Sequence, residues 1–390
     1  MPVAAPPEPR FGRAWAAVLR HGVLLLLLAF AALQFTYRWA IDDSRPHDGS
    51  LGWHAFHDQG FYYLEASSLA HLDPIPVADF VLAPGYPMLA APFSRFGALG
   101  WPSGDPFFAA DLAVWLFTIA TMYLVGRRLF GEWFGVACAL ATMLATPLVE
   151  LVAVPLNSTA VLASLMATML VALARELRWW HGAILGAAVA FAYSARYVDA
   201  LWIAIAAVTV LVARRGLSWR SNAWLAAIVG AYLTALPTFY LHWHAFGKPF
   251  TATYREYRSY TIEGEDFELA NIVPHALQGF VSPFYFDENG FRSLTARPML
   301  ASMFLALLAP VGWILLARHV HGPTRVLVVG FGTTAVAATL FYLAFSFTGS
   351  YGLQRGGLHY YKAWWPLWTF AATAGVYLVV QRVSAAASRR

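Results

Sequence analysis

The sequence predicts an all-α polytopic membrane protein with about ten transmembrane helices. Hydrophobic residues make up 59% of the 390 residues and charged residues only 12%, whereas a typical soluble domain carries about 25% charged residues. The mean hydropathy is +0.55, and apolar runs recur along the whole chain. No soluble stretch of domain size separates them, so we expect residues 1–390 to form one membrane domain without a separate soluble domain.

Eight apolar segments are each long enough to cross a bilayer, which takes about 20 helical residues. They lie near 18–40, 107–126, 133–154, 155–174, 222–243, 298–317, 326–347 and 363–380. The stretch 181–213 fits two short helices with Arg196 and Asp199 near its middle, and a hairpin there would bring both charges to the water interface. The predicted total is ten, with an uncleaved first helix.

The arginines predict the orientation, because cytoplasmic loops carry an excess of basic residues. They fall beside every second helix end: Arg10, Arg13, Arg20, Arg127, Arg128, Arg175, Arg178, Arg214, Arg215, Arg220, Arg318, Arg325, Arg382, Arg389 and Arg390. Both termini are then cytoplasmic, and the loops 41–104, 244–297 and 348–362 share the external side. Basic residues at helix ends suit topology and lipid headgroups rather than nucleic acid.

The first external loop contains the sequence HDQGFYYLEASSLA and then APGYPMLAAP. Phe61, Leu64, Ser68 and Leu72 recur at helical spacing, which predicts an amphipathic helix over 60–72 lying in the membrane interface. The run Pro84-Gly85-Tyr86-Pro87 breaks the chain before a second apolar helix that is too short to span.

Asp58 comes directly before the first of these helices, where the helix N-terminus would keep its carboxylate ionised. This position suits a general base facing the water layer, and an N-cap role is an equal alternative. Asp42, Asp43 and Asp48 are rival acids, but they lie in a stretch typical of a solvated loop.

His47, His54, His57 and His71 raise the possibility of a metal site, since imidazole and carboxylate groups bind divalent ions. Their spacing fits no standard site. We therefore predict no metal ligands and no required cofactor, with a divalent ion left open as an alternative.

Three basic residues are expected on the external side: Arg196, Arg355 and Lys362. Positive charge at the mouth of a helix bundle suits a phosphate group, and Gly356-Gly357 after Arg355 would let backbone approach an anion closely. Lys362 is predicted to snorkel to the interface, and Arg196 could instead pair with Asp199.

Several segments resemble the GT-C superfamily of membrane glycosyltransferases, in particular bacterial relatives of protein O-mannosyltransferases and of the aminoarabinose transferase of lipid A. The similar segments follow the family's order on the predicted external side: HDQGFYYLEASSLA, APGYPMLAAPFSRFG, WHAFGKPFTATY, GFVSPFYFDENGFRSLTARPML and LQRGGLHYYKAWWPLW. The chain departs from the family pattern at Gln59, at Ala83 and at Asn157-Ser158.

The resemblance implies a GT-C fold and the transfer of a sugar, with inversion, from a polyprenyl-phosphate donor to a lipid, glycan or protein acceptor. It implies a catalytic acid at Asp58 and donor-phosphate contacts at Arg196 and Arg355, to which we add His359. His57, Tyr62, Tyr86 and Tyr254 are candidates for the substrate pocket. The expected location is the bacterial inner membrane, with the site on the periplasmic side and a role in cell-envelope glycan biosynthesis.

Two other function classes remain open. A transporter or flippase of a lipid-linked sugar would also use a charged cavity in a helix bundle, although the chain lacks the repeated halves typical of transporters. An acyltransferase would use a histidine base, for which His57 or His359 is the candidate.

Overall fold

A computed structural model describes most of the chain. It covers residues 10–41, 57–73, 75, 83–95, 106–145, 157–215, 222–251, 268–273, 296–344 and 362–388. Within these ranges the backbone alone is described for 10–21, 41, 57–60, 95, 106, 215 and 296–307.

The described residues fold almost entirely into helices, with no strand among them. In chain order the helices are α1 (Arg10–Ile41), α2 (His57–His71), α3 (Gly85–Arg95), α4 (Pro106–Phe130), α5 (Glu132–Leu144), α7 (Asn157–Ala172), α8 (Trp179–Ala195), α9 (Tyr197–Arg215), α10 (Asn222–Phe246), the short 3₁₀ helix η3 (Leu269–Asn271), α13 (Ala296–His319), α14 (Gly322–Ala344) and α17 (Trp365–Ala387). The all-α prediction is therefore confirmed for the part of the chain that the structure describes.

Six of these helices are long and apolar enough to cross a membrane, which supports an integral membrane protein. They are α1, α4, α9, α10, α14 and α17. The four other predicted segments contain α5, α7, α8 and α13, with 13, 16, 17 and 24 residues respectively. Each of the ten predicted segments thus contains a helix, and the crossing of the membrane by all ten stays a prediction.

The two short helices of the first loop also form. The helix α2 covers nearly all of the predicted range 60–72, and α3 begins at Gly85 inside the Pro-Gly-Tyr-Pro run. With 11 residues, α3 is too short to span a bilayer. Gly85 lies against backbone atoms of Ser194 and Ala195, so a side chain at this position would overlap α8.

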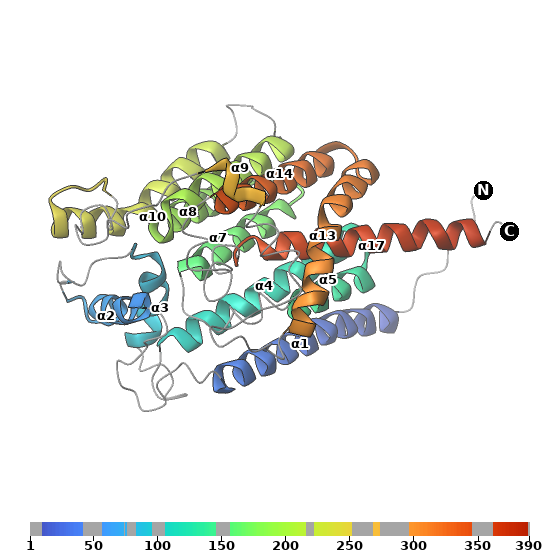
Figure 1. Ribbon diagram of the computed structural model, residues 1–390, viewed down its shortest axis with the longest axis horizontal. Coiled ribbons are helices and arrows are strands. Elements are labelled where there is room, and N and C mark those ends of the chain that lie inside the picture. The colour runs from blue at the N-terminus through green and yellow to red at the C-terminus, as the bar shows by residue number, and fades with distance from the viewer. Residues whose placement is uncertain are drawn as a thin grey trace.

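The long helices form one bundle with two distinct ends (Figure 1). The beginning of α1 and the end of α17 lie at the same end, and α2 and α3 lie at the opposite end. We call the first the arginine-rich end, because Arg127, Arg128, Arg178, Arg214, Arg318 and Arg382 lie at the helix ends there. We call the second the loop-bearing end, since α2 and α3 belong to the first long loop.

Small residues let two helix pairs approach until backbone meets backbone. A Cβ added at Gly182 or Gly186 of α8 would overlap the carbonyl groups of Ala223 and Ala227 of α10. In the same way, Gly312 of α13 leaves room only for the backbone of Ala371 on α17. Such small-residue crossings are typical of helix association in membranes, where packing rather than water exclusion holds helices together.

Replacing Gly186 by alanine is expected to destabilise the protein by about 1–3 kcal/mol, because the added methyl group must push α8 away from α10. The unfolding free energy in a denaturing-detergent titration would measure the loss. The matched control is Gly22→Ala in α1, where the added carbon meets no described atom within 4 Å apart from its own stretch of helix, so the change should be neutral or slightly stabilising. Equal stability of the two variants would contradict the close crossing.

Candidate functional site

The structure describes only some of the predicted site residues. Arg355, His359 and Tyr254 lie outside the described residues, as do Asp42, Asp43, Asp48, His47 and His54. His57 and Asp58 are described by their backbone alone, at the beginning of α2. The side chains of Tyr62, Tyr86, Arg196 and Lys362 are described and can be placed.

The helix α2 begins one residue earlier than its predicted capping residue. Because the helix starts at His57, Asp58 lies inside the first turn rather than immediately before it, so the predicted N-cap position is not the one observed. An acid in the first turn still gains from the helix dipole.

One face of α2 is buried and carries an acid that the sequence reasoning did not select. Tyr62, Glu65 and Ala66 are buried, with Glu65 at 0% exposure, whereas the predicted apolar residues Leu64 and Leu72 are exposed. Position 58 precedes Tyr62 by four residues and Glu65 by seven, the spacing of one helix face. Because Glu65 follows Asp58 by seven residues, this spacing could have identified Glu65 from the sequence as a second acid on the same face as Asp58.

Tyr86 connects three helices near their loop-bearing ends. Its hydroxyl donates a hydrogen bond to Oδ1 of Asp111 on α4 at 2.9 Å, and its backbone N–H donates to Oδ1 of Asn157 on α7 at 3.3 Å. Its ring stacks on that of Phe107, with 5.1 Å between the ring centres, and packs edge to face with the ring of Tyr62, with 5.4 Å between the centres. Tyr86 is fully buried, so its contacts hold α3 against α4 and α7, and its place in the substrate pocket stays a prediction.

Asp199 is the centre of a second buried polar group. Its Oδ2 lies 3.6 Å from Nη1 of Arg196, and its Oδ1 accepts a hydrogen bond of 3.3 Å from the indole N–H of Trp364. The side chain of Tyr342 also hydrogen-bonds this carboxylate, and the Arg196 guanidinium lies 5.7 Å from the centre of the Tyr342 ring.

The predicted hairpin between α8 and α9 forms, but it does not expose both charges. Asp199 is fully buried, because residues from α14 and from the beginning of α17 cover it. The expectation that Asp199 lies at the water interface is therefore wrong, and the alternative pairing of Arg196 with Asp199 is the one observed.

Lys362 is also buried, with 2% of its surface exposed. Its ammonium group donates a hydrogen bond of 2.7 Å to the hydroxyl of Thr159, in the first turn of α7. The predicted snorkelling of Lys362 to the interface is wrong, because a polar partner on α7 makes burial possible.

The first turn of α7 bonds both Tyr86, through Asn157, and Lys362, through Thr159, and Lys362 lies two residues before Trp364, which bonds Asp199. We call the whole set the loop-end polar network: Tyr86, Asp111, Asn157, Thr159, Arg196, Asp199, Tyr342, Lys362 and Trp364. Its members come from the loop-bearing ends of six helices or the turns beside them. Such a fixed set of buried charges can orient an ionic substrate group without reorganising.

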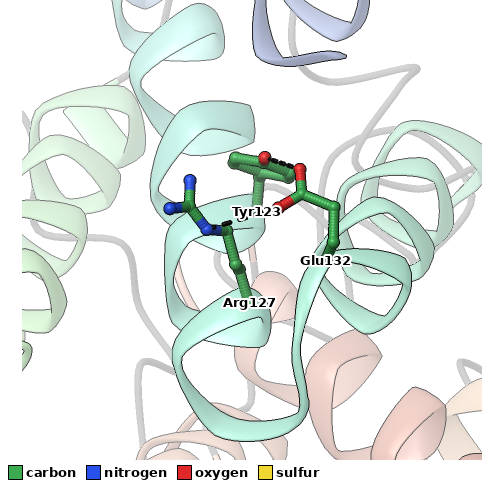
Figure 2. Close-up of polar contacts among 3 residues, drawn as sticks. All are labelled: Tyr123, Arg127 and Glu132. Atoms are coloured by element: carbon green, nitrogen blue, oxygen red, sulfur yellow. Dashed lines mark hydrogen bonds and ion pairs between the residues drawn. The ribbon is translucent and has the colours of Figure 1, made fainter. Parts of the chain in front are cut away.

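A different polar group lies at the arginine-rich end, at the turn between α4 and α5 (Figure 2). Glu132 accepts a hydrogen bond from the Tyr123 hydroxyl, and its other oxygen lies 3.4 Å from Nε of Arg127. Gly131, with φ of 93°, allows the reversal between the helices. Glu132 therefore ties α5 to α4 and neutralises Arg127.

No three His, Cys, Asp or Glu side chains converge into a metal-binding group within the described part of the chain. No family model matches this sequence, and no curated protein is significantly similar to it. The functional conclusion therefore depends on the residues and their arrangement.

Proposed function

We propose that this protein is a polyprenyl-phosphate-sugar-dependent glycosyltransferase of GT-C type. The observation that carries the proposal is the loop-end polar network, which holds the buried Lys362 and the partly exposed Arg196 at the same end of the bundle as α2. The first turn of α2 carries Asp58. A base for the acceptor hydroxyl and basic side chains for the leaving phosphate are the two elements that this transfer needs, and both are proposed to lie at this end.

In the proposed reaction the oxygen of an acceptor hydroxyl attacks the anomeric carbon of the sugar. The Asp58 carboxylate takes the hydroxyl proton, and the bond from the anomeric carbon to the phosphate oxygen breaks, so polyprenyl phosphate leaves with the electron pair. Attack from the side opposite the leaving group inverts the anomeric carbon. Negative charge grows on the leaving phosphate, which basic side chains stabilise in the transition state.

Arg355 and His359 are proposed to contact the donor phosphate, with Arg196 supporting them. The chain itself limits where they can lie, because His359 precedes the anchored Lys362 by three residues and Arg355 by seven. Extended chain covers at most about 3.6 Å per residue, so these residues stay within about 11 Å and 25 Å of that anchor. The guanidinium of Arg196 already faces Asp199, which suits a positioning role. His57, Tyr62, Tyr86 and Tyr254 remain the proposed pocket residues.

In this proposal the protein crosses the bacterial inner membrane ten times, with both termini in the cytoplasm and the reaction on the periplasmic face. The arginines at one end of the bundle support this orientation. The acceptor is a glycan, lipid or protein of the cell envelope. A required metal is not part of the proposal, since basic side chains can neutralise a monophosphate leaving group.

The direct test incubates purified protein in detergent with a panel of polyprenyl-phosphate sugars and a mixture of cell-envelope acceptors. Release of free polyprenyl phosphate together with a glycosylated acceptor supports a transferase. Movement of intact lipid-linked sugar across proteoliposomes without any release would indicate the transporter instead. No release with any donor, from protein that remains folded, would contradict the proposal.

Replacing Arg355 by alanine is expected to raise the KM for the donor by about tenfold or more, because a charge-assisted hydrogen bond of about 1.5–3 kcal/mol is lost. Initial rates at varied donor concentration measure the change. The control is Arg318→Ala, which removes an exposed arginine from the arginine-rich end. An equal KM in the two variants would remove Arg355 from the phosphate site.

A further inference from the structure

A cavity of about 460 Å³ lies at the arginine-rich end, far from the loop-end polar network. This volume falls within the usual range of ligand pockets, about 300–1,000 Å³. The cavity is lined by residues of α4, α7, α9, α13, α14 and α17, so it enters the bundle between these helices and is partly open to the outside.

The cavity has an apolar lining and a basic rim. Trp313, Leu327, Phe331 and Phe370 line it and are buried. The rim carries exposed polar side chains, namely Arg128, His319 and His321, together with the half-buried Arg214. An apolar interior beneath a polar rim suits a molecule that has a polar head and a hydrocarbon tail.

The rim carries a positive charge from its arginines. Arg128 and Arg214 both line the cavity, and no acidic residue is among the described residues that line it. Arg214 donates a hydrogen bond of 2.7 Å to the carbonyl of Ala172, which holds its side chain at the rim. Arg127, by contrast, is paired through its Nε with Glu132 (Figure 2).

Exposed tryptophans place this rim at the level of lipid headgroups. Trp133 at the beginning of α5 is 85% exposed and Trp179 at the beginning of α8 is 64% exposed. Both lie at the arginine-rich end, within a few residues of Arg127 and Arg178. Tryptophans gather at the boundary between hydrocarbon and water, so the basic rim faces the layer that holds lipid phosphates.

We propose that this cavity binds one anionic phospholipid from the leaflet at the arginine-rich end. The lipid phosphate lies between Arg128 and Arg214, and one acyl chain enters the space beside Trp313 and Phe331. The uncompensated basic rim selects a lipid with net negative charge over a zwitterionic one. This binding site is separate from the proposed transferase site and does not depend on it.

The test measures the retained lipid by native mass spectrometry, after the detergent-purified protein is titrated with phosphatidylglycerol or with phosphatidylcholine of the same chain length. Inorganic phosphate and glycerophosphoglycerol form two further arms that carry the anion without a tail. The variants Arg128→Gln and Arg214→Gln each remove one rim charge. The matched control is Arg382→Gln, an exposed arginine at the same end that does not line the cavity.

One phosphatidylglycerol is expected per protein, with each rim variant binding it about fivefold more weakly and the control unchanged, since one basic residue near an anionic lipid contributes about 1 kcal/mol. Val328→Phe, which fills the apolar part without changing charge, should also lower retention. Three results would overturn the proposal: equal binding of phosphatidylcholine, an equal loss in Arg382→Gln, or binding of the tail-less anions as tight as that of the lipid.

Discussion

The Asp58→Asn protein is expected to fold and bind donor but to release polyprenyl phosphate at least about a hundredfold more slowly than the wild type. A positioned general base contributes roughly 10²–10⁴-fold to a rate, and the amide of asparagine cannot take the proton of the acceptor hydroxyl. Single-turnover release of polyprenyl phosphate would measure the chemical step apart from donor binding.

The same substitution separates catalysis from helix stability. Because Asp58 lies in the first turn of α2, loss of its charge should cost only about 0.3–1 kcal/mol of interaction with the helix dipole. The control Asp73→Asn removes an exposed acid just after the other end of α2 and should leave the rate unchanged. Normal turnover by Asp58→Asn would show that another group is the base, and the buried Glu65 on the same helix would be the next candidate.

The Asp199→Ala protein is expected to lose about 3–5 kcal/mol of stability. This change leaves Arg196 without the carboxylate that lies 3.6 Å from it, and it removes the acceptor of the Trp364 indole N–H. Breaking an ion pair whose carboxylate is fully buried is costly, because the guanidinium left behind is only 17% exposed and therefore poorly solvated. The unfolding free energy in a denaturing-detergent titration would measure the loss.

The double variant Asp199→Ala/Arg196→Ala provides the control for that loss. If the loss of stability in Asp199→Ala comes from the uncompensated guanidinium of Arg196, removing that guanidinium should restore a large part of the stability. The losses caused by Asp199→Ala and by Arg196→Ala should then not be additive. A double variant that is less stable than Asp199→Ala by the full cost of Arg196→Ala would contradict this account. The hydrogen bond to Trp364 would then carry the effect.

The helices could be predicted closely because they follow from local composition. A run of apolar residues needs no partner to indicate a membrane helix, so each of the ten predicted segments contains a helix. Pro84 and Gly85 interrupt regular structure, so they likewise predicted where α3 begins. The predicted helix starts were less accurate, because the first turn of a helix depends on contacts that the flanking residues do not determine. The helix α2, for example, begins at His57 and not after Asp58.

The candidate site could be predicted only in part, because burial of a polar residue depends on partners far away in the chain. Lys362 is 203 residues from Thr159, and Asp199 is 165 residues from Trp364. No local pattern indicates such pairs, so Lys362 was expected at the surface and Asp199 in water. The pairing of Arg196 with Asp199 was foreseeable, since the two are three residues apart at a helix start.

The glycine crossings have a mechanical consequence. Where Gly186 meets Ala227 and Gly312 meets Ala371, the backbones touch with no side chain between them that could change rotamer. Two helices in such contact cannot slide past each other by repacking, so we expect α8 with α10, and α13 with α17, each to move as a single rigid lever. A change in the spacing of these four helices is then expected to come from movement of each pair as a whole.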